Sequence, residues 1–412
     1  MLLVESHPSS VIHDLAALFI VAAFAAAFYP TCKAQGYHLA QDFSGPDFFQ
    51  GFRYNVSDRD WNNFGNVHFI SQSDAEQKHM TFVDLNGRAI ISVDNTTDGR
   101  TDGNFGRDTV YLVSNNPVNF GSLVVFDAVH IPFGCSVWPA LFTQGHVWPE
   151  EGEIDIIENV NLATQNQYAL HTAISSGTCL KQSNDGQTGK TTNGNCTVVP
   201  EQDINTGCVV QDASSKSFGK GFADSGGGVF SMLWDAAGVS LWFFERSSIP
   251  PNIDTAPDPS SWPTPSAFYP ADSCDPSTAF GPQFLTLYID ICGAFAGAPE
   301  LWPTSGCASA AVSKCDDLVQ DPANYNNAYW MINYLRVFES DSSSSSSSSP
   351  SRSGSSPSGT ASSGSVSAGT GTSSTTGSPG TGGSANQSSA IQNIPIVAYS
   401  IVFSSALILV LI

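Results

Sequence analysis

The chain has 412 residues, of which 13% are charged, against about 25% in an average globular protein, and it contains 36 glycines and 24 prolines. This composition excludes helical bundles and coiled coils, which need many Ala, Glu, Lys and Leu residues, and it favours strands joined by turns. The formal charge of −22 excludes nucleic acid as a partner, because phosphate binding requires clustered Lys and Arg.

The first feature in chain order is an apolar run at residues 15–29, too short to span a bilayer comfortably. It is followed by small residues directly before Gln35. These features predict a secretory signal peptide over residues 1–34, although the segment before the run is acidic, with Glu5 and Asp14. A retained signal anchor is the alternative.

The body of the chain, residues 35–340, is predicted to form one all-β domain. Residues 283–291 alternate between apolar and polar side chains, the period of a strand. Residues 228–234 and 239–244 flank a four-residue turn and predict a hairpin, and residues 328–338 predict the last strand. No segment shows apolar residues at helical spacing over three turns.

Nine cysteines are present, and cleavage before Gln35 would remove Cys32. The remaining eight, an even number in an exported protein, predict disulfides whose pairing the sequence leaves open. Their spacing matches no zinc motif, so no metal site is predicted. N-glycosylation is expected at sequons that begin at Asn55, Asn95, Asn195 and Asn386.

The C-terminal part differs sharply in composition from the body. Residues 341–389 are rich in Ser, Gly and Thr and predict an extended stalk, because almost nothing there is apolar enough to form a core. Residues 390–412 end in an apolar tail and fit a GPI-attachment signal, with a tail-anchor helix as the alternative. The protein is therefore expected to be secreted or held at the cell surface, touching the membrane only through a lipid anchor.

One acidic segment stands out, residues 148–159 (WPEEGEIDIIEN). In an extended strand Glu153 and Asp155 share one face while the intervening isoleucines point into the core. A regular strand would turn Glu158 to the opposite face, so we predict a β-bulge at residues 156–157 that returns it to the side of Glu153 and Asp155.

Two glutamates on one face have the chemistry of a retaining glycosidase, because close carboxyls raise each other's pKa. One is then left protonated as an acid and one charged as a nucleophile. Two other interpretations stay open from spacing alone. The segment is then either the solvated acidic face of an edge strand or a calcium site.

The segment GEIDIIE at residues 152–158, preceded by GCSVWPA at 134–140, resembles glycoside hydrolase family 16. Within that family it is similar to the fungal laminarinase-like endo-1,3(4)-β-glucanases. The resemblance spans residues 35–339. The E-x-D-x-x-E pattern has one residue more than the E-x-D-x-E form of lichenases and plant xyloglucan transferases, which points to the laminarinase side of the family.

The resemblance implies a curved β-jelly-roll sandwich, similar to concanavalin A, with an open concave cleft. It also implies that Glu153 is the nucleophile and Glu158 the general acid/base. Asp155 would hydrogen-bond to the nucleophile and help to set its protonation.

Three further residues match family positions near the cleft. Trp138 and Trp148 are expected to stack on sugar rings, and His171 to face the carboxylates, although a lone Trp or His in a strand is more often a core residue. Two departures concern substrate contacts rather than chemistry. Tyr111 stands where the family often has Arg, and Phe142 where relatives often carry Trp.

Together these features predict a monomeric, retaining endo-β-glucanase that acts on 1,3- or mixed 1,3/1,4-β-glucan. No cofactor is required by this chemistry, and a structural calcium ion is not indicated. A cell-wall transglycosylase on the same fold is the alternative. A non-catalytic glucan-binding surface protein is a third interpretation.

Overall fold

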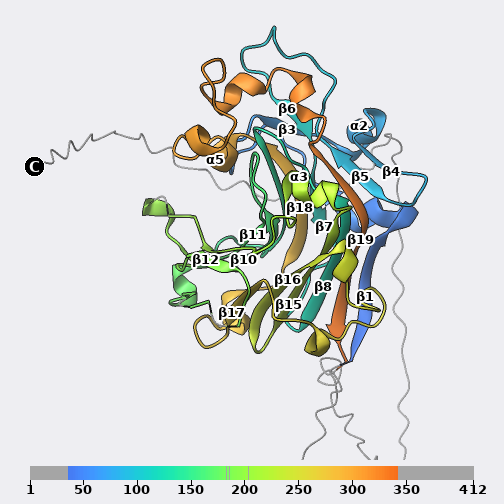
Figure 1. Cartoon of the computed structure of the whole chain (residues 1–412), viewed down its shortest axis with the longest axis vertical. Coiled ribbons are helices and arrows are strands. Elements are labelled where there is room, and N and C mark those ends of the chain that lie inside the picture. The colour runs from blue at the N-terminus through green and yellow to red at the C-terminus, as the bar shows by residue number, and fades with distance from the viewer. Residues whose placement is uncertain (1–35, 182, 185, 203, 342–412) are drawn as a thin grey trace, which may run out of the picture. The chain divides into compact units, whose positions relative to one another are not determined.

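The structure is a computed structural model that describes residues 36–181, 183–184, 186–202 and 204–341 (Figure 1). The predicted signal peptide, the predicted GPI signal and the sequon at Asn386 lie outside the described residues, and so does the predicted stalk after Asp341. Within the described part of the chain, no helix is both long and apolar enough to cross a membrane.

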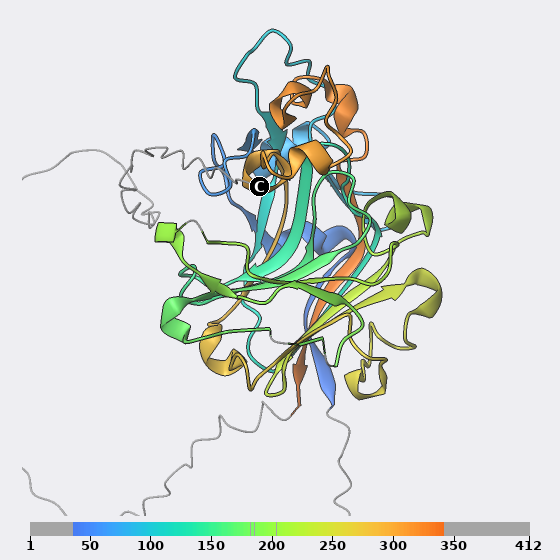
Figure 2. The same cartoon turned by 60° about the vertical axis from the view of Figure 1, so that its left-hand side comes forward.

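Two large, mainly antiparallel sheets form a sandwich (Figures 1 and 2). The eight-stranded sheet has the order β17-β16-β15-β8-β19-β5-β4, and β1 pairs with β19, so the first and last strands of the described body lie side by side. Its strands are β1 (Tyr37–Ser44), β4 (Thr81–Val83), β5 (Ala89–Ser92), β8 (Ser122–His130), β15 (Gly228–Asp235), β16 (Gly238–Glu245), β17 (Ala267–Pro270) and β19 (Tyr329–Ser340).

The nine-stranded sheet has the order β12-β14-β11-β10-β9-β18-β7-β2, and β13 pairs with β11. Its strands are β2 (Phe52–Tyr54), β7 (Tyr111–Ser114), β9 (Val137–Gln144), β10 (Glu153–Glu158), β11 (Gln167–Ala173), β12 (Lys190–Asn193), β13 (Thr197–Val198), β14 (Cys208–Gln211) and β18 (Phe284–Ile291). The acidic strand β10 therefore lies inside this sheet, between β9 and β11, and the edge-strand interpretation is wrong.

The remaining elements are short and lie in the connections. A parallel pair is formed by β3 (Val67–Phe69) and β6 (Arg107–Thr109). The α-helices are α2 (Gln72–Gln77), α3 (Gly219–Asp224), α4 (Pro276–Ala279) and α5 (Gly293–Ala296). The 3-10 helices are η1 (Gly45–Gly51), η2 (Ile174–Ser176), η3 (Pro200–Gln202), η4 (Arg246–Ser248), η5 (Pro259–Ser261), η6 (Trp302–Thr304), η7 (Cys315–Leu318) and η8 (Pro322–Tyr325).

The alternation predicted for residues 283–291 is confirmed in β18. Its four apolar residues from Leu285 to Ile291 are fully buried in the core, while Tyr288 and Asp290 lie on the other face. The predicted hairpin is confirmed as well, because β15 pairs with β16 and Asp235 lies opposite Gly238 across the turn.

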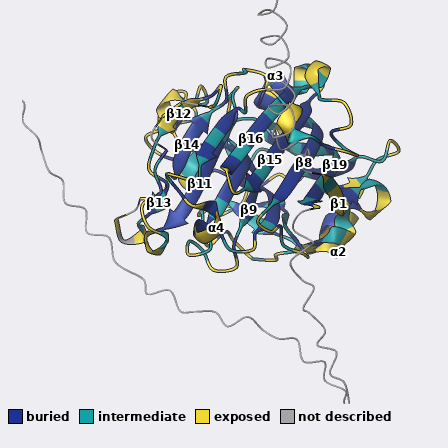
Figure 3. Cartoon of the chain, turned by 90° about the horizontal axis from the view of Figure 1, so that it is seen from below, coloured by how far each residue is buried: buried dark blue, intermediate teal, exposed yellow. Residues whose placement is uncertain are grey.

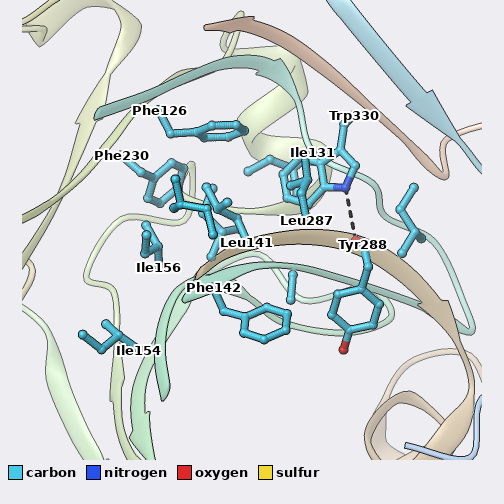
Figure 4. Close-up of a cluster of buried hydrophobic side chains, with 14 of the residues drawn as sticks. Phe126, Ile131, Leu141, Phe142, Ile154, Ile156, Phe230, Leu287, Tyr288 and Trp330 are labelled. Carbon is cyan, nitrogen blue, oxygen red and sulfur yellow. Dashed lines mark hydrogen bonds between the residues drawn. The ribbon is translucent and has the colours of Figure 1, made fainter. Parts of the chain in front are cut away.

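Most residues of the sheet strands are buried (Figure 3), and side chains from both sheets form the core between them (Figure 4). Phe126, Phe230 and Trp330 from the eight-stranded sheet meet Leu141 and Ile156 from the nine-stranded one. Burying one such side chain stabilises the fold by about 1.5–3 kcal/mol. Figure 4 also shows that Tyr288 and Phe142, which are buried as well, lie on the opposite side of the nine-stranded sheet from Leu141 and Ile156. The predicted all-β jelly roll is confirmed.

All eight predicted cysteines form disulfides, and the structure supplies the pairing that the sequence left open. Cys179–Cys274 joins the connection between η2 and β12 to the connection between β17 and α4. Cys196–Cys208 joins the residue before β13 to the first residue of β14. Cys135–Cys307 and Cys292–Cys315 attach the connection after α5 to the nine-stranded sheet.

Candidate active site

The predicted β-bulge is present in β10. Against β11 the register runs from Asp155–Ala169 directly to Glu158–Gln167, so two residues of β10 lie opposite Tyr168 alone. Ile154, Ile156 and Ile157 are all fully buried. The bulge thus allows the isoleucines to enter the core while Glu158 returns to the outer face of the sheet.

A glycine directly before Glu153 is required by the local packing. Gly152 has a φ of +71°, in the left-handed region that favours glycine. A Cβ at this position would lie 2.7 Å from the carbonyl oxygen of Ala279 and 2.4 Å from the ring of Phe280. The backbone can therefore turn sharply into β10 and present Glu153 at the start of the strand.

Glu158 makes a hydrogen bond to a predicted site residue. The indole Nε1 of Trp138, on the neighbouring strand β9, donates to Glu158 Oε1 over 2.8 Å. Burial and the charge of Asp155 raise the pKa of Glu158 to about 8, while the bond from Trp138 lowers it. At neutral pH this carboxyl is therefore held in its protonated form, ready to donate a proton.

Glu153 and Asp155 behave as a coupled acid pair. Burial first, and then the charge of Asp155, raises the pKa of Glu153 well above its usual range. Burial also raises the pKa of Asp155 to about 7, although its hydrogen bond with Glu153 opposes this. Because Asp155 is buried, Glu153 is half-buried and the two carboxyls lie side by side, the pair retains one proton near neutral pH.

His171 faces the acid pair from β11. It lies opposite Glu153 in the register, and its Nε2 is 3.2 Å from Asp155 Oδ2. Gly207 allows this placement, because a Cβ there would lie 2.8 Å from the imidazole Nε2. Glu153, Asp155 and His171 each offer an atom within 4.8 Å of the others, so these are the described residues that could hold a metal ion.

Trp148 is the predicted site residue that the structure does not connect to the carboxyls. It lies on the β9–β10 connection and is half-buried. Its indole N–H is buried without a hydrogen-bond partner among the described residues. Its stacking on a sugar ring stays a prediction.

Tyr288 was not singled out from the sequence, yet it lies close to the candidate site. It pairs with Ala140, which in turn pairs with Glu158, so only a small side chain separates the phenol from the acid across β9. The charge of Glu158 contributes to raising the pKa of Tyr288. Tyr111, which stands where the family often has Arg, forms an aromatic pair with Tyr288, with ring centroids 5.4 Å apart. The signal was the period-two pattern of β18, which places Tyr288 on the opposite face from Leu287 and Ile289.

A second residue of β18 that sequence reasoning missed is the acid Asp290. It is fully buried beside Asp60, and burial and the charge of Asp60 raise its pKa well above the usual range. Asp290 pairs with Trp138 in the register, so it lies at the Trp138 end of the site. Nothing in the sequence brings Asp60 and Asp290 together, because 230 residues separate them.

The three described sequons all present an exposed asparagine, namely Asn55, Asn95 and Asn195. Exposure is what an N-linked glycan requires, and its attachment stays a prediction.

Half-buried and buried carboxyls with raised pKa values, set beside aromatic rings on one sheet face, are typical of an enzyme that moves protons at a neutral, ring-bearing substrate such as a sugar. The model of the XgeA-like catalytic domain of glycoside hydrolase family 16 (GH16) matches residues 52–338. The chain belongs to this family and is a glycoside hydrolase.

Fungal relatives agree with this membership. A probable glycosidase of Schizosaccharomyces pombe is 33% identical over 314 residues, covering 76% of this chain and 71% of that protein. A probable endo-1,3(4)-β-glucanase of Aspergillus fumigatus is 34% identical over 351 residues, covering 82% of this chain. The alignment spans only 51% of that A. fumigatus protein.

Solved structures show the same fold. Laminarinase 16A from Phanerochaete chrysosporium, determined with 6-O-glucosyl-laminaritriose in donor and acceptor sites, is 32% identical with a TM-score of 0.68. The match covers 74% of this chain and 100% of the laminarinase chain. An elongating GH16 β-1,3-glucosyltransferase is 37% identical with a TM-score of 0.67, covering 73% of this chain and 99% of its own.

Proposed function

We propose that the protein is a retaining endo-β-glucanase that hydrolyses 1,3- or mixed 1,3/1,4-β-glucan. The observation that carries this proposal is the bulged strand β10, which holds Glu153 and Glu158 on one face with raised pKa values. Relatives named endo-1,3(4)-β-glucanase and a laminarinase bound to β-glucan support the substrate class.

Glu153 is the nucleophile of the proposed reaction and Glu158 its general acid/base. The Glu153 carboxylate attacks the anomeric carbon while Glu158 gives its proton to the departing glycosidic oxygen, which leaves a glycosyl ester on Glu153. Glu158, now ionised, takes a proton from water, and the water oxygen displaces Glu153 from the anomeric carbon. Two displacements retain the β-configuration.

Asp155 serves the first displacement by accepting the proton that the acid pair shares, which otherwise rests on Glu153. When that proton resides on Asp155, Glu153 is ionised and able to attack, and the hydrogen bond between the two carboxyls persists. His171, next to Asp155, assists by favouring the ionised form of Glu153. The reaction as written needs no cofactor and no metal ion.

The proposed setting follows from the ends of the chain and from its charge. A neutral glucan needs no cationic groove, which agrees with a net charge of −22. The predicted signal peptide and GPI signal, with the four disulfides, support a secreted or surface-anchored enzyme that works as a monomer on wall or extracellular glucan.

A transglycosylase is the second candidate, and one observation favours it. The elongating glucosyltransferase is the more identical of the two solved structures described above, at 37%. In that case a glucan hydroxyl replaces water in the second displacement. Products longer than a pure short donor, seen by mass spectrometry, identify transfer.

The test uses the full-length protein and Glu153→Gln, incubated with laminarin and with mixed-linkage glucan, with products followed by size and by proton NMR of the anomers. We expect short β-anomeric products from the parent and a loss of at least about 10³-fold in the variant. Products first formed as α-anomers would contradict retention. Binding without any products would leave a glucan-binding protein.

Azide then separates the two roles. In Glu158→Ala it replaces water and should give a β-glycosyl azide. In Glu153→Ala it replaces the nucleophile and should give the α-azide. The reverse assignment of anomers would overturn the proposed roles.

A further inference from the structure

Asn166, which precedes β11, bridges the bulge of β10 with its side-chain amide. Its Oδ1 accepts the backbone N–H of Glu158 over 3.0 Å, and its Nδ2 donates to the carbonyl oxygen of Ile156 over 2.9 Å. Asn166 is fully buried, so both contacts are made away from water. One amide thus pairs the backbone groups on both sides of Ile157.

The bulge makes this pairing necessary. Where two residues of β10 oppose Tyr168 alone, the regular ladder has no partner for every backbone group. A buried backbone group without a hydrogen-bond partner destabilises the fold, because it loses its bonds to water and gains none in return. Without the bridge, a regular register over these residues would turn Glu158 to the other face.

The bridge itself is held on both sides. The backbone N–H of Asn166 donates to Ser217 Oγ over 2.8 Å, and its carbonyl accepts from the N–H of Asp212 over 2.9 Å. Ser217 Oγ in turn donates to the carbonyl of Ser214 over 2.7 Å. The amide of Asn166 is therefore fixed relative to β10 by contacts outside the strand.

We propose that Asn166 is a positioning residue that aims Glu158 by fixing the bulge. The Glu158 side chain is oriented by Trp138 and its backbone by Asn166, which touches neither substrate nor the reacting atoms in the proposed reaction. This inference rests on the proposed acid/base role of Glu158.

The test compares two substrates of the full-length protein: a laminari-oligosaccharide, whose leaving group needs a proton from Glu158, and a 2,4-dinitrophenyl β-oligoglucoside, whose leaving group does not. With Asn166→Ala we expect kcat on the oligosaccharide to fall about 10–100-fold while KM changes less than about threefold. The burst of dinitrophenolate, which reports the first displacement, should stay within about threefold of the parent. A purely structural role would lower both rates equally.

Asn159→Ala is the matched control. Asn159 braces the same β10–β11 turn, donating to the carbonyl of Gln165 over 2.7 Å, but it contacts neither bulge group. Its variant should keep kcat on both substrates. If Asn166→Ala does not fold, Asn166→Asp replaces it, because it keeps the size and the acceptor for Glu158 but loses the donor to Ile156.

Equal losses on the two substrates, or the same result for Asn166→Ala and Asn159→Ala, would overturn the inference. Glu158→Ala is measured alongside. If that variant keeps full activity, the proposed function of Glu158 fails. If it is inactive and Asn166→Ala is not selectively impaired, only the role of Asn166 fails.

Discussion

The two sheets bury acidic side chains in opposite ways. In the eight-stranded sheet, Asp127 on β8 receives two bonds from the guanidinium of Arg246, of 2.8 and 2.7 Å, and a third from Asn333. In the nine-stranded sheet, the acids of β10 and Asp290 of β18 form no ion pair with Lys or Arg among the described residues. Their pKa values are raised instead.

A paired and an unpaired buried acid have different physical consequences. A buried carboxylate with a bidentate arginine is neutralised and pins strands together. A buried carboxyl without a cation keeps a proton at a cost to stability, and this is the state that an acid catalyst or a shared-proton pair requires. The cost is concentrated in the sheet that carries the candidate site.

The largest effect on stability is expected from removing the cation that pairs with Asp127. Arg246→Met leaves Asp127 buried, at 6% exposure, with Asn333 alone. Because a buried charge without its partner is strongly unfavourable, we expect a loss of about 2–4 kcal/mol in the free energy of unfolding, measured in urea with the disulfides intact. Activity at 25 °C should be unchanged.

Lys216→Met is the control for Arg246. Lys216 also pairs with an acid, 2.8 Å from Glu245, but both side chains are partly exposed, at 51% and 33%. Its loss should cost less than about 1 kcal/mol. Similar losses in the two variants would mean that the burial of Asp127 does not matter.

A smaller effect on stability, of opposite sign, is expected from replacing Asp290, a buried acid without a cation. Asp290→Asn removes a buried acid that has no cation and can still accept the N–H of Ile291, which Asp290 Oδ1 accepts over 2.7 Å. The pKa of Asp290 is raised by folding, so the parent loses stability as pH rises above the pKa of an unfolded Asp, about 3.9. The variant has no such loss.

We therefore expect equal Tm values for parent and Asp290→Asn near pH 4, and a variant more stable by roughly 2–4 °C at pH 8. Differential scanning calorimetry across this range measures it. Asp58→Asn, at an exposed position, makes the same change in net charge and should leave Tm unaltered. A variant less stable than the parent at pH 8 would show that Asp290 is stabilising as a charge.

Features set by residues close together in the chain could be predicted from the sequence, whereas features set by residues far apart in the chain could not. The bulge was predictable because Glu153, Asp155 and Glu158 lie on one strand, where the two-residue period limits each side chain to one face. The roles of Asn166 and Asp290 were not predictable, because they depend on contacts that only the fold creates: Asn166 with the backbone of the bulge, and Asp290 with Asp60. The eight cysteines were predictable as disulfides, and only their pairing required the fold.

The smallest effect is expected at Glu158, which receives a hydrogen bond from a neutral donor, Trp138, rather than from a cation. Trp138→Phe removes the Nε1–H bond that lowers the pKa of Glu158, so this pKa should rise above about 8. Because Glu158 must be protonated to act as an acid, activity is lost as pH rises through this pKa. The alkaline limb of kcat/KM on laminarin should therefore shift upward by about half a pH unit to one unit.

Phe295→Leu is the control, since Phe295 packs on Trp138 with ring centroids 5.5 Å apart and its loss should leave the alkaline limb in place. A downward shift in Trp138→Phe would mean that the titrating group is not Glu158.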